Sequence, residues 1–255
     1  MHPVLLRIGS FTIYTYGLLV AVGIAVVFFL ALRRTKRLKY PSEQIIYNLA
    51  FTAIIAGLIG ARTIHVAAEW GYYRNHLTEI FLLRRGGLAI QGGILFGLVF
   101  GTWYLYLTKT SPLPVLDSFF LYLPVGQAIG RLGCFFNGCC YGRPSSLPWA
   151  IKFPFLEARV HPTELYYLAA HLGLFFVLNL FSQEENIQKG ELTAWYFILY
   201  GFIRSLLDNF RGDLLPGFLG LYATQWYAIL FTIFGAIMLT TLKINNRKRF
   251  KEFRE

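Results

Sequence analysis

Long apolar stretches, separated by short polar or basic segments, run along the whole chain. They cover approximately residues 13–32, 45–67, 92–107, 115–129, 163–181, 191–210 and 214–242. An α-helix rises about 1.5 Å per residue, so about 20 apolar residues cross a hydrocarbon layer of ~30 Å. The pattern therefore predicts an all-α integral membrane protein of about seven transmembrane helices, with residues 1–255 forming one polytopic domain.

Composition supports the same class of protein. Hydrophobic residues make up 56% of the chain and charged residues only 15%, and a soluble domain of that kind would expose large apolar patches. A bilayer solves this problem by acting as the apolar solvent. The formal net charge of +11 does not indicate nucleic-acid binding, because the basic residues occur in bursts near residues 33–39 and 243–254 rather than in one stripe.

The basic bursts also predict an orientation. Lys and Arg accumulate in cytoplasmic loops, so the segment after the first stretch and the tail at 243–255 should both be cytoplasmic. An odd number of spans then places the N-terminus outside, on the periplasmic side. A basic segment rather than a small-residue cleavage site follows the first stretch, which we expect to be retained as a span. The glycine-rich segment at about 130–162 becomes an outward-facing loop.

Glycines within the apolar stretches predict close helix packing, because small residues let helix backbones approach each other in a bilayer. The glycines concerned are Gly57, Gly60, Gly93, Gly97 and Gly101.

Ionisable side chains inside membrane helices are costly, and each is therefore a functional candidate. Here they gather toward the predicted outer ends of the spans, as Arg62, Arg131, His161, Arg204 and Asp208 illustrate.

One set of these side chains shares a single helix face. Tyr200, Arg204 and Asp208 recur every four residues, and Arg211 falls close to them. A guanidinium group matches phosphate oxygens in a bidentate geometry, and glycines at a helix entrance let backbone amides approach an anion. We therefore expect a site for the head group of a phosphorylated lipid.

Six segments carry a resemblance to a known family. They are IYTYGLL (13–19), IGAR (59–62), GGLAIQGG (86–93), GRLGCFFNGCCYG (130–142), HPTELYY (161–167) and YGFIRSLLD (200–208). In this order, over nearly the whole chain, they resemble the bacterial prolipoprotein diacylglyceryl transferases. The resemblance implies an enzyme of the bacterial inner membrane. It transfers a diacylglyceryl group from phosphatidylglycerol to the lipobox cysteine of a prolipoprotein signal peptide, forming a thioether and releasing glycerol phosphate.

The resemblance also implies site residues. Arg131 and Arg204 would hold and neutralise the phosphate, Tyr16 would line the site, and Asp208 would hold Arg204 by an ion pair. The residues expected to contact substrate are Arg62, Gln91, Gly92, Gly93, Gly130, Cys134, Asn137, Cys139, Gly142, His161 and Tyr200.

Three positions depart from the family pattern, which has His at Gln91, Asn at Cys134 and Glu at Cys139. Glutamine does not titrate, so Gln91 is not a general base for the thiol proton. A cysteine is already a few per cent ionised at neutral pH, and nearby arginines would increase that fraction. We therefore favour an arginine-assisted route, with His65, His161 or Asp208 as alternative bases.

The cysteines Cys134, Cys139 and Cys140 form a small cluster in the sequence. Three sulfur ligands with no His or carboxylate in the same stretch make a poor zinc site, so packing is favoured over metal binding. Neither a metal nor an organic cofactor is expected. A disulfide in an outward-facing segment remains open, and the sequence does not select the pair.

Two other functions remain as alternatives. Gln91 and Cys139 motivate a diverged family member that acts on another phospholipid or acceptor. A membrane transporter is disfavoured, because the chain shows no internal repeat and its polar residues gather at one side of the membrane.

Overall fold

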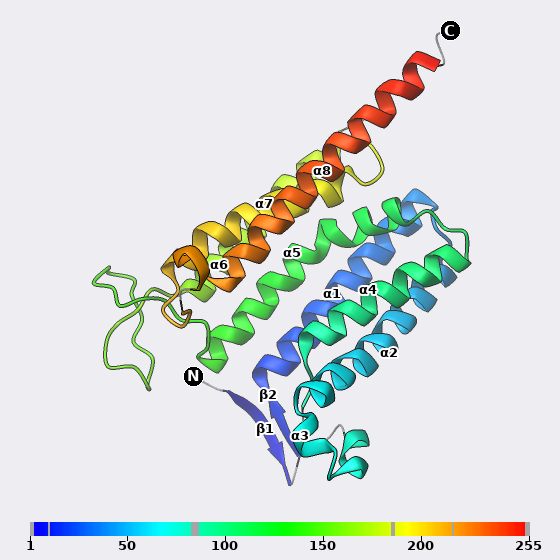
Figure 1. Cartoon of the computed structure of the whole chain (residues 1–255). Coiled ribbons are helices and arrows are strands. Elements are labelled where there is room, and N and C mark those ends of the chain that lie inside the picture. The colour runs from blue at the N-terminus through cyan, green and yellow to red at the C-terminus, as the bar shows by residue number, and fades with distance from the viewer. Residues whose placement is uncertain (1–2, 10, 83–86, 185–186, 216, 253–255) are drawn as a thin grey trace. The chain divides into compact units, whose positions relative to one another are not determined.

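The computed structural model is mostly helical and describes residues 3–9, 11–82, 87–184, 187–215 and 217–252 (Figure 1). Backbone proximity divides the chain into two compact units. The first unit comprises residues 1–31 and 116–255, and the second comprises residues 32–115. The division falls within two long helices, α1 (Thr15–Leu38) and α5 (Pro112–Asn137). That the chain forms a single polytopic domain stays a prediction.

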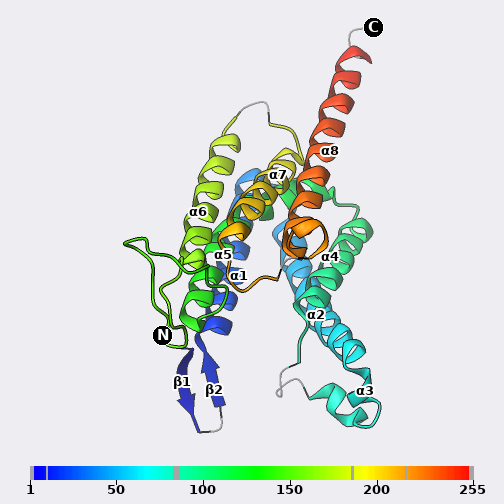
Figure 2. The same cartoon turned by 60° about the vertical axis from the view of Figure 1, so that its left-hand side comes forward.

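The first unit is built mainly from helices. Besides parts of α1 and α5 it contains α6 (Thr163–Phe181), α7 (Glu191–Leu207) and α8 (Ala223–Glu252), with short 3-10 helices η3 (Asp208–Phe210) and η4 (Phe218–Gly220). Helices α7 and α8 lie side by side, and α6 packs on α7 (Figures 1 and 2). Leu121, Leu174, Leu178 and Tyr196 form a buried apolar core among α5, α6 and α7.

The second unit contains α2 (Glu43–Ala68), α3 (Trp70–Tyr73), the 3-10 helix η1 (Leu77–Phe81) and α4 (Ile90–Leu107). Helices α2 and α4 pack along each other (Figure 1). A Cβ atom on Gly60 would lie 2.5 Å from the backbone oxygen of Gly92, and one on Gly57 would lie 3.2 Å from that of Gly93. Close packing at the predicted glycines of these two helices is therefore confirmed.

Several helices have the length and composition of membrane spans. Within the described residues five qualify, namely α1, α2, α5, α6 and α8 as far as Asn246. Residues 92–107 of α4 form a shorter apolar helix. Large apolar side chains such as Phe29 and Phe51 are more than 60% exposed in the chain alone, as expected where lipid is the solvent. The protein is accordingly a multi-pass helical membrane protein.

Several helix boundaries differ from the predicted apolar stretches. Helix α5 continues to Asn137 rather than ending near Ile129, so the first part of the predicted loop is helical. Gly133, in this added part of the helix, is a packing position, since a Cβ there would lie 3.2 Å from Cδ2 of Tyr16. Helix α8 begins at Ala223 rather than near residue 214, because residues 214–222 form a loop that includes η4. The basic tail is helical to Glu252, and residues 253–255 lie outside the described residues.

The N-terminal hairpin is an addition to the predicted all-α fold. Strands β1 (Val4–Ile8) and β2 (Phe11–Tyr14) pair antiparallel, and Gly9 between them has a φ of +58°. The amide of Thr15 donates to the backbone oxygen of Pro3 at 3.0 Å, so the hairpin closes where α1 begins. The strands are too short for periodicity to have separated them from a helix entrance.

Candidate active site

Two arginines of the first unit are linked through one buried tyrosine. The guanidinium carbon of Arg131, on α5, lies 4.1 Å from the ring centroid of Tyr167, on α6. The hydroxyl of Tyr167 donates a hydrogen bond to Oδ1 of Asp208, and Oδ2 of Asp208 lies 3.6 Å from Nε of Arg204. Tyr167 and Asp208 are 1% and 0% exposed. The chain of contacts Arg131–Tyr167–Asp208–Arg204 therefore connects side chains from α5, α6 and the end of α7.

The predicted helix face is present at the end of α7. Nη1 of Arg204 donates to the hydroxyl of Tyr200 at 3.2 Å, and the expected ion pair between Arg204 and Asp208 is formed. Nη1 of Arg211 lies 3.9 Å from Oδ1 of Asp208, so two guanidinium groups flank one buried carboxylate.

Arg211 itself is anchored by a second carboxylate. Its Nε and Nη2 donate to the two carboxylate oxygens of Asp213, at 2.8 and 2.6 Å. Burial alone would lower the pKa of Arg211, but the bonds to Asp213 outweigh it and raise that pKa.

A buried histidine stands beside the same residues. His171 is 1% exposed, and its ring stacks on Tyr200 with the ring centroids 5.9 Å apart. Neither ring nitrogen of His171 has a hydrogen-bond partner among the described residues, and the imidazole interacts electrostatically with both Arg131 and Arg204. Sequence reasoning missed Tyr167 and His171, although their spacing of four residues places both on one face of α6.

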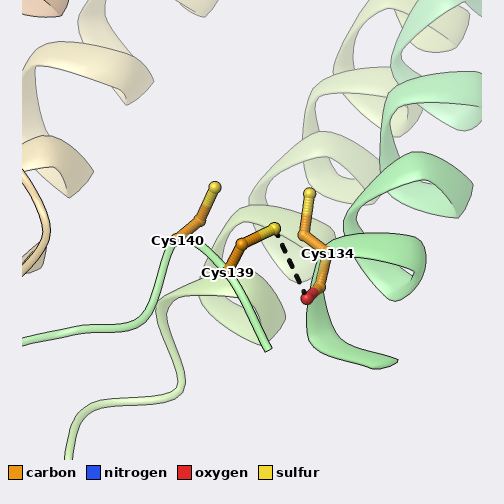
Figure 3. Close-up of side chains that lie close together, drawn as sticks. All are labelled: Cys134, Cys139 and Cys140. Carbon is orange, nitrogen blue, oxygen red and sulfur yellow. Dashed lines mark hydrogen bonds between the residues drawn. The ribbon is translucent and has the colours of Figure 1, made fainter. Parts of the chain in front are cut away.

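The three cysteines lie together where α5 ends (Figure 3). Their Sγ atoms are all within 4.8 Å of one another, and the three thiols are free, so none forms a disulfide in the structure. The Sγ of Cys139 lies 3.8 Å from the backbone oxygen of Cys134, and the Asn137 side chain also hydrogen-bonds to this thiol. Hydrogen bonds from the thiols of Cys134 and Cys140 lower the pKa of Cys139 well below its usual range.

Tyr16 belongs to the same neighbourhood. It lies at the start of α1, is 38% exposed, and interacts electrostatically with the three thiols and with Arg131. Its ring packs on Gly133 of α5. At Gly130, by contrast, an added Cβ would find no atom within 4 Å.

Gly142 lies at a junction of three segments. Its amide donates to the backbone oxygen of His161 at 2.9 Å, and the amide of the next residue, Arg143, donates to that of Phe210 at 2.8 Å. A Cβ on Gly142 would lie 2.5 Å from the His161 backbone oxygen. The Nδ1 of His161 lies 3.1 Å from the hydroxyl of Tyr166, and its ring packs against Phe210. The structure thus joins the loop after α5 to the start of α6 and to the end of η3.

The remaining candidates belong to the second unit. Arg62 is 7% exposed and donates to the backbone oxygens of Ile80 at 2.7 Å, Gly87 at 2.9 Å and Glu79 at 2.5 Å. It therefore holds the segment between α3 and α4. Gly92 and Gly93 pack against α2. The side chain of Gln91 and the residue Gly86 lie outside the described residues. A substrate contact by any of these residues stays a prediction.

The fold and this cluster define a class, a multi-pass helical membrane protein with arginines gathered around a buried carboxylate and aromatic rings. Within that class, the chain belongs to the prolipoprotein diacylglyceryl transferase family, whose sequence model matches residues 3–241. The family resemblance read from the six segments is thereby confirmed.

Similar proteins cover most or all of the chain, and each is named a phosphatidylglycerol–prolipoprotein diacylglyceryl transferase. The protein of Clostridioides difficile (strain 630) is 34% identical over 253 residues, covering 99% of this chain and 100% of that relative. The protein of Finegoldia magna is 35% identical over 241 residues, covering 93% and 94%. The protein of Thermotoga maritima is 36% identical over 217 residues, covering 81% and 73%.

Proposed function

We propose that this protein transfers the diacylglyceryl group of phosphatidylglycerol to the thiol of a prolipoprotein cysteine. The family and the names of its relatives support both substrates. The observation that carries the proposal is the chain of contacts from Arg131 through Tyr167 and Asp208 to Arg204. This chain holds two guanidinium groups around the hydrogen-bonded pair of Tyr167 and Asp208.

The chemistry of the transfer explains why arginines are needed. The cysteine thiol loses its proton to solvent, its sulfur forms a bond to the glyceryl carbon, and the bond from that carbon to the phosphate oxygen breaks. The electron pair stays with the departing glycerol phosphate, which gains one negative charge. Cationic donors fixed in advance stabilise this charge more in the transition state than in the bound lipid.

Each group of the cluster takes a role in this scheme. Arg131 and Arg204 bind the phosphate oxygens, and Asp208 orients Arg204. Tyr167 holds Asp208 by its hydroxyl and supports Arg131 with its ring face. The same positive field favours the thiolate form of the incoming cysteine, so the route requires no dedicated base in place of Gln91.

The other predicted contacts surround this centre in the proposal. From the first unit, Tyr16, Gly130, Asn137, Gly142 and His161 line the space for the lipid and the lipobox.

The proposed topology has seven spans. Helices α4 and α7 join the five helices that qualify by length and composition. With the N-terminus outside, the start of α1, the ends of α5 and α7 and the start of α6 all lie at the outer face. Arg131 and Arg204 then face the periplasmic leaflet of the bacterial inner membrane. Tagging each terminus and measuring protease access in intact spheroplasts tests this topology.

Reconstitution in liposomes with labelled phosphatidylglycerol and a lipobox peptide tests the reaction, with the thioether product as the readout. Arg131→Ala and Arg204→Ala should each reduce turnover by about 10²–10³-fold, as for loss of one preorganised donor. Arg33→Ala, at an exposed position of the basic segment after the first apolar stretch, is the matched control and should stay near full activity.

Three results would contradict the proposal. Full turnover in Arg131→Ala, in protein inserted correctly in the membrane, refutes the arginine-assisted mechanism. Consumption of phospholipid without thioether on the peptide would favour a family member with another acceptor, and solute flux without lipid turnover would favour a transporter.

A further inference from the structure

We propose that Cys134, Cys139 and Cys140, together with the buried carboxylate of Glu164, bind a divalent metal ion of the zinc type. This site lies beside Arg131 and goes beyond the transfer reaction.

The first support is the geometry of the thiols. Helix α5 ends after Cys134, and the amide of Cys139 donates back to the Cys134 backbone oxygen at 3.2 Å. Positive φ angles of +76° at Gly138 and +68° at Cys140 turn the chain tightly at this point. This turn is why the three sulfurs lie within 4.8 Å of one another (Figure 3).

The observed separation is close to what a metal requires. A tetrahedral zinc ion with Zn–S bonds of about 2.3 Å holds its sulfur ligands about 3.8 Å apart. Closing the remaining gap of at most about 1 Å between sulfur atoms requires only small rotations of short side chains.

The second, independent support is Glu164. Its side chain is 0% exposed, yet neither carboxylate oxygen has a hydrogen-bond partner in another described residue, its own backbone amide being the only donor that acts on it. A carboxylate buried in this way is costly unless an ion or a donor compensates it.

Glu164 is also adjacent to the thiols. The Oγ1 of Thr163 donates to the backbone oxygen of Cys140 at 2.5 Å, which brings the first turn of α6 onto the cysteine turn. The Glu164 carboxylate interacts electrostatically with both Cys139 and Cys140. In the proposed site, Glu164 is the fourth ligand that the stretch 134–140 lacks. Three thiolates and one carboxylate form a donor set that selects a zinc-like ion over magnesium or calcium.

The surrounding charges balance such a site. Three thiolates and one carboxylate carry four negative charges, and the metal ion contributes two positive charges. Two guanidinium groups contribute the other two positive charges. Arg131 interacts with Cys134 and Glu164, and Arg211 interacts with Cys140. Binding releases the thiol protons to solvent and changes no oxidation state.

Occupancy would fasten the end of α5 to the start of α6. Arg131 lies on that end of α5 and Tyr167 on that part of α6, so the metal would brace the contact between them. A ligand that binds only the folded protein also raises its thermal stability in proportion to its occupancy.

Titration of the reduced, metal-free full-length protein with Co²⁺ or Cd²⁺ tests the site. The sulfur-to-metal charge-transfer absorption should grow and saturate at one ion per chain, and the unfolding temperature should rise with it. Neither Cys140 nor Glu164 belongs to the proposed transferase centre, so variants at both positions are suitable. Cys140→Ser and Glu164→Gln should each weaken binding by at least about tenfold, while Glu157→Gln, at an exposed position, should bind like the wild type.

Three outcomes would overturn the proposal. The first is the absence of charge-transfer absorption in the reduced wild-type protein. The second is unchanged affinity in Cys140→Ser. The third is unchanged affinity in Glu164→Gln, a result that would show that Glu164 is not the fourth ligand. Unfolding of a variant would also weaken metal binding, so the helical circular dichroism of each variant is measured before titration.

Discussion

The replacement Asp208→Asn would remove the negative charge between two arginines while keeping an oxygen to accept the hydrogen bond from Tyr167. Asp208 is 0% exposed, and its carboxylate lies 3.6 Å from Arg204 and 3.9 Å from Arg211. With Asn in its place, the two guanidinium groups lose their shared, buried counter-ion.

The magnitude follows from these distances. Two unit charges about 4 Å apart attract each other by about 4 kcal/mol at an effective dielectric constant of ~20. Removing one partner of a buried pair costs about 3–5 kcal/mol when the other charge is left uncompensated. Arg204 would be left so, whereas Arg211 keeps its ion pair with Asp213. We expect Asp208→Asn to lower the free energy of unfolding by that amount. Because Arg204 loses its orientation, we also expect kcat for thioether formation to fall by about 10²-fold.

The assay is thioether formation in liposomes, with kcat and KM for phosphatidylglycerol measured separately. As a positioning residue, Asp208 should affect kcat more than KM, since the arginines still attract the lipid phosphate. The control is Asp208→Glu, which keeps the charge and should retain activity within about tenfold of the wild type. Full turnover in Asp208→Asn would refute the reasoning, as would an equal loss in Asp208→Glu and Asp208→Asn.

Three further predictions concern other residues of the first unit. His171→Phe keeps the stacked ring but removes both ring nitrogens. A fall in kcat with an intact fold would indicate that the imidazole acts on substrate. An unchanged pH–rate profile would exclude that role for the imidazole. Asp117→Ala removes the carboxylate that accepts from the amide of Gly190 and from Thr193, and should destabilise the protein by about 3 kcal/mol in thermal unfolding. Gly142→Ala should cost about 1–3 kcal/mol by overpacking, whereas Gly130→Ala should leave stability unchanged or higher; equal unfolding temperatures for the two would contradict this.

Local features were predictable because they depend on neighbours in the sequence. The four-residue spacing of Tyr200, Arg204 and Asp208 was enough to place them on one helix face, and their contacts are present. The glycines of α2 and α4 predicted close helix packing, because small residues in an apolar stretch can be recognised from the sequence alone. Runs of apolar residues predicted the helices, although not where α5 and α8 begin and end.

Contacts between distant segments could not be predicted in this way. Arg62 was predicted to contact substrate, but its donors bind backbone oxygens of the following segment, which only the folded chain brings within reach. Glu164 was one carboxylate in a family motif. Its position beside Cys140 depends on how the loop after α5 turns back onto α6.

By itself, the sequence determined the class of this protein, its family and the helix face that carries Arg204, because hydrophobic length, motif order and helical period are all local properties. Only the tertiary structure decided that Tyr167 bridges Arg131 to Asp208, that His171 lies buried against Tyr200, and that three thiols lie near a buried carboxylate with no partner in another described residue. Those arrangements depend on side chains packed across α5, α6 and α7, and residue spacing along one helix carries no information about which neighbour its face will contact.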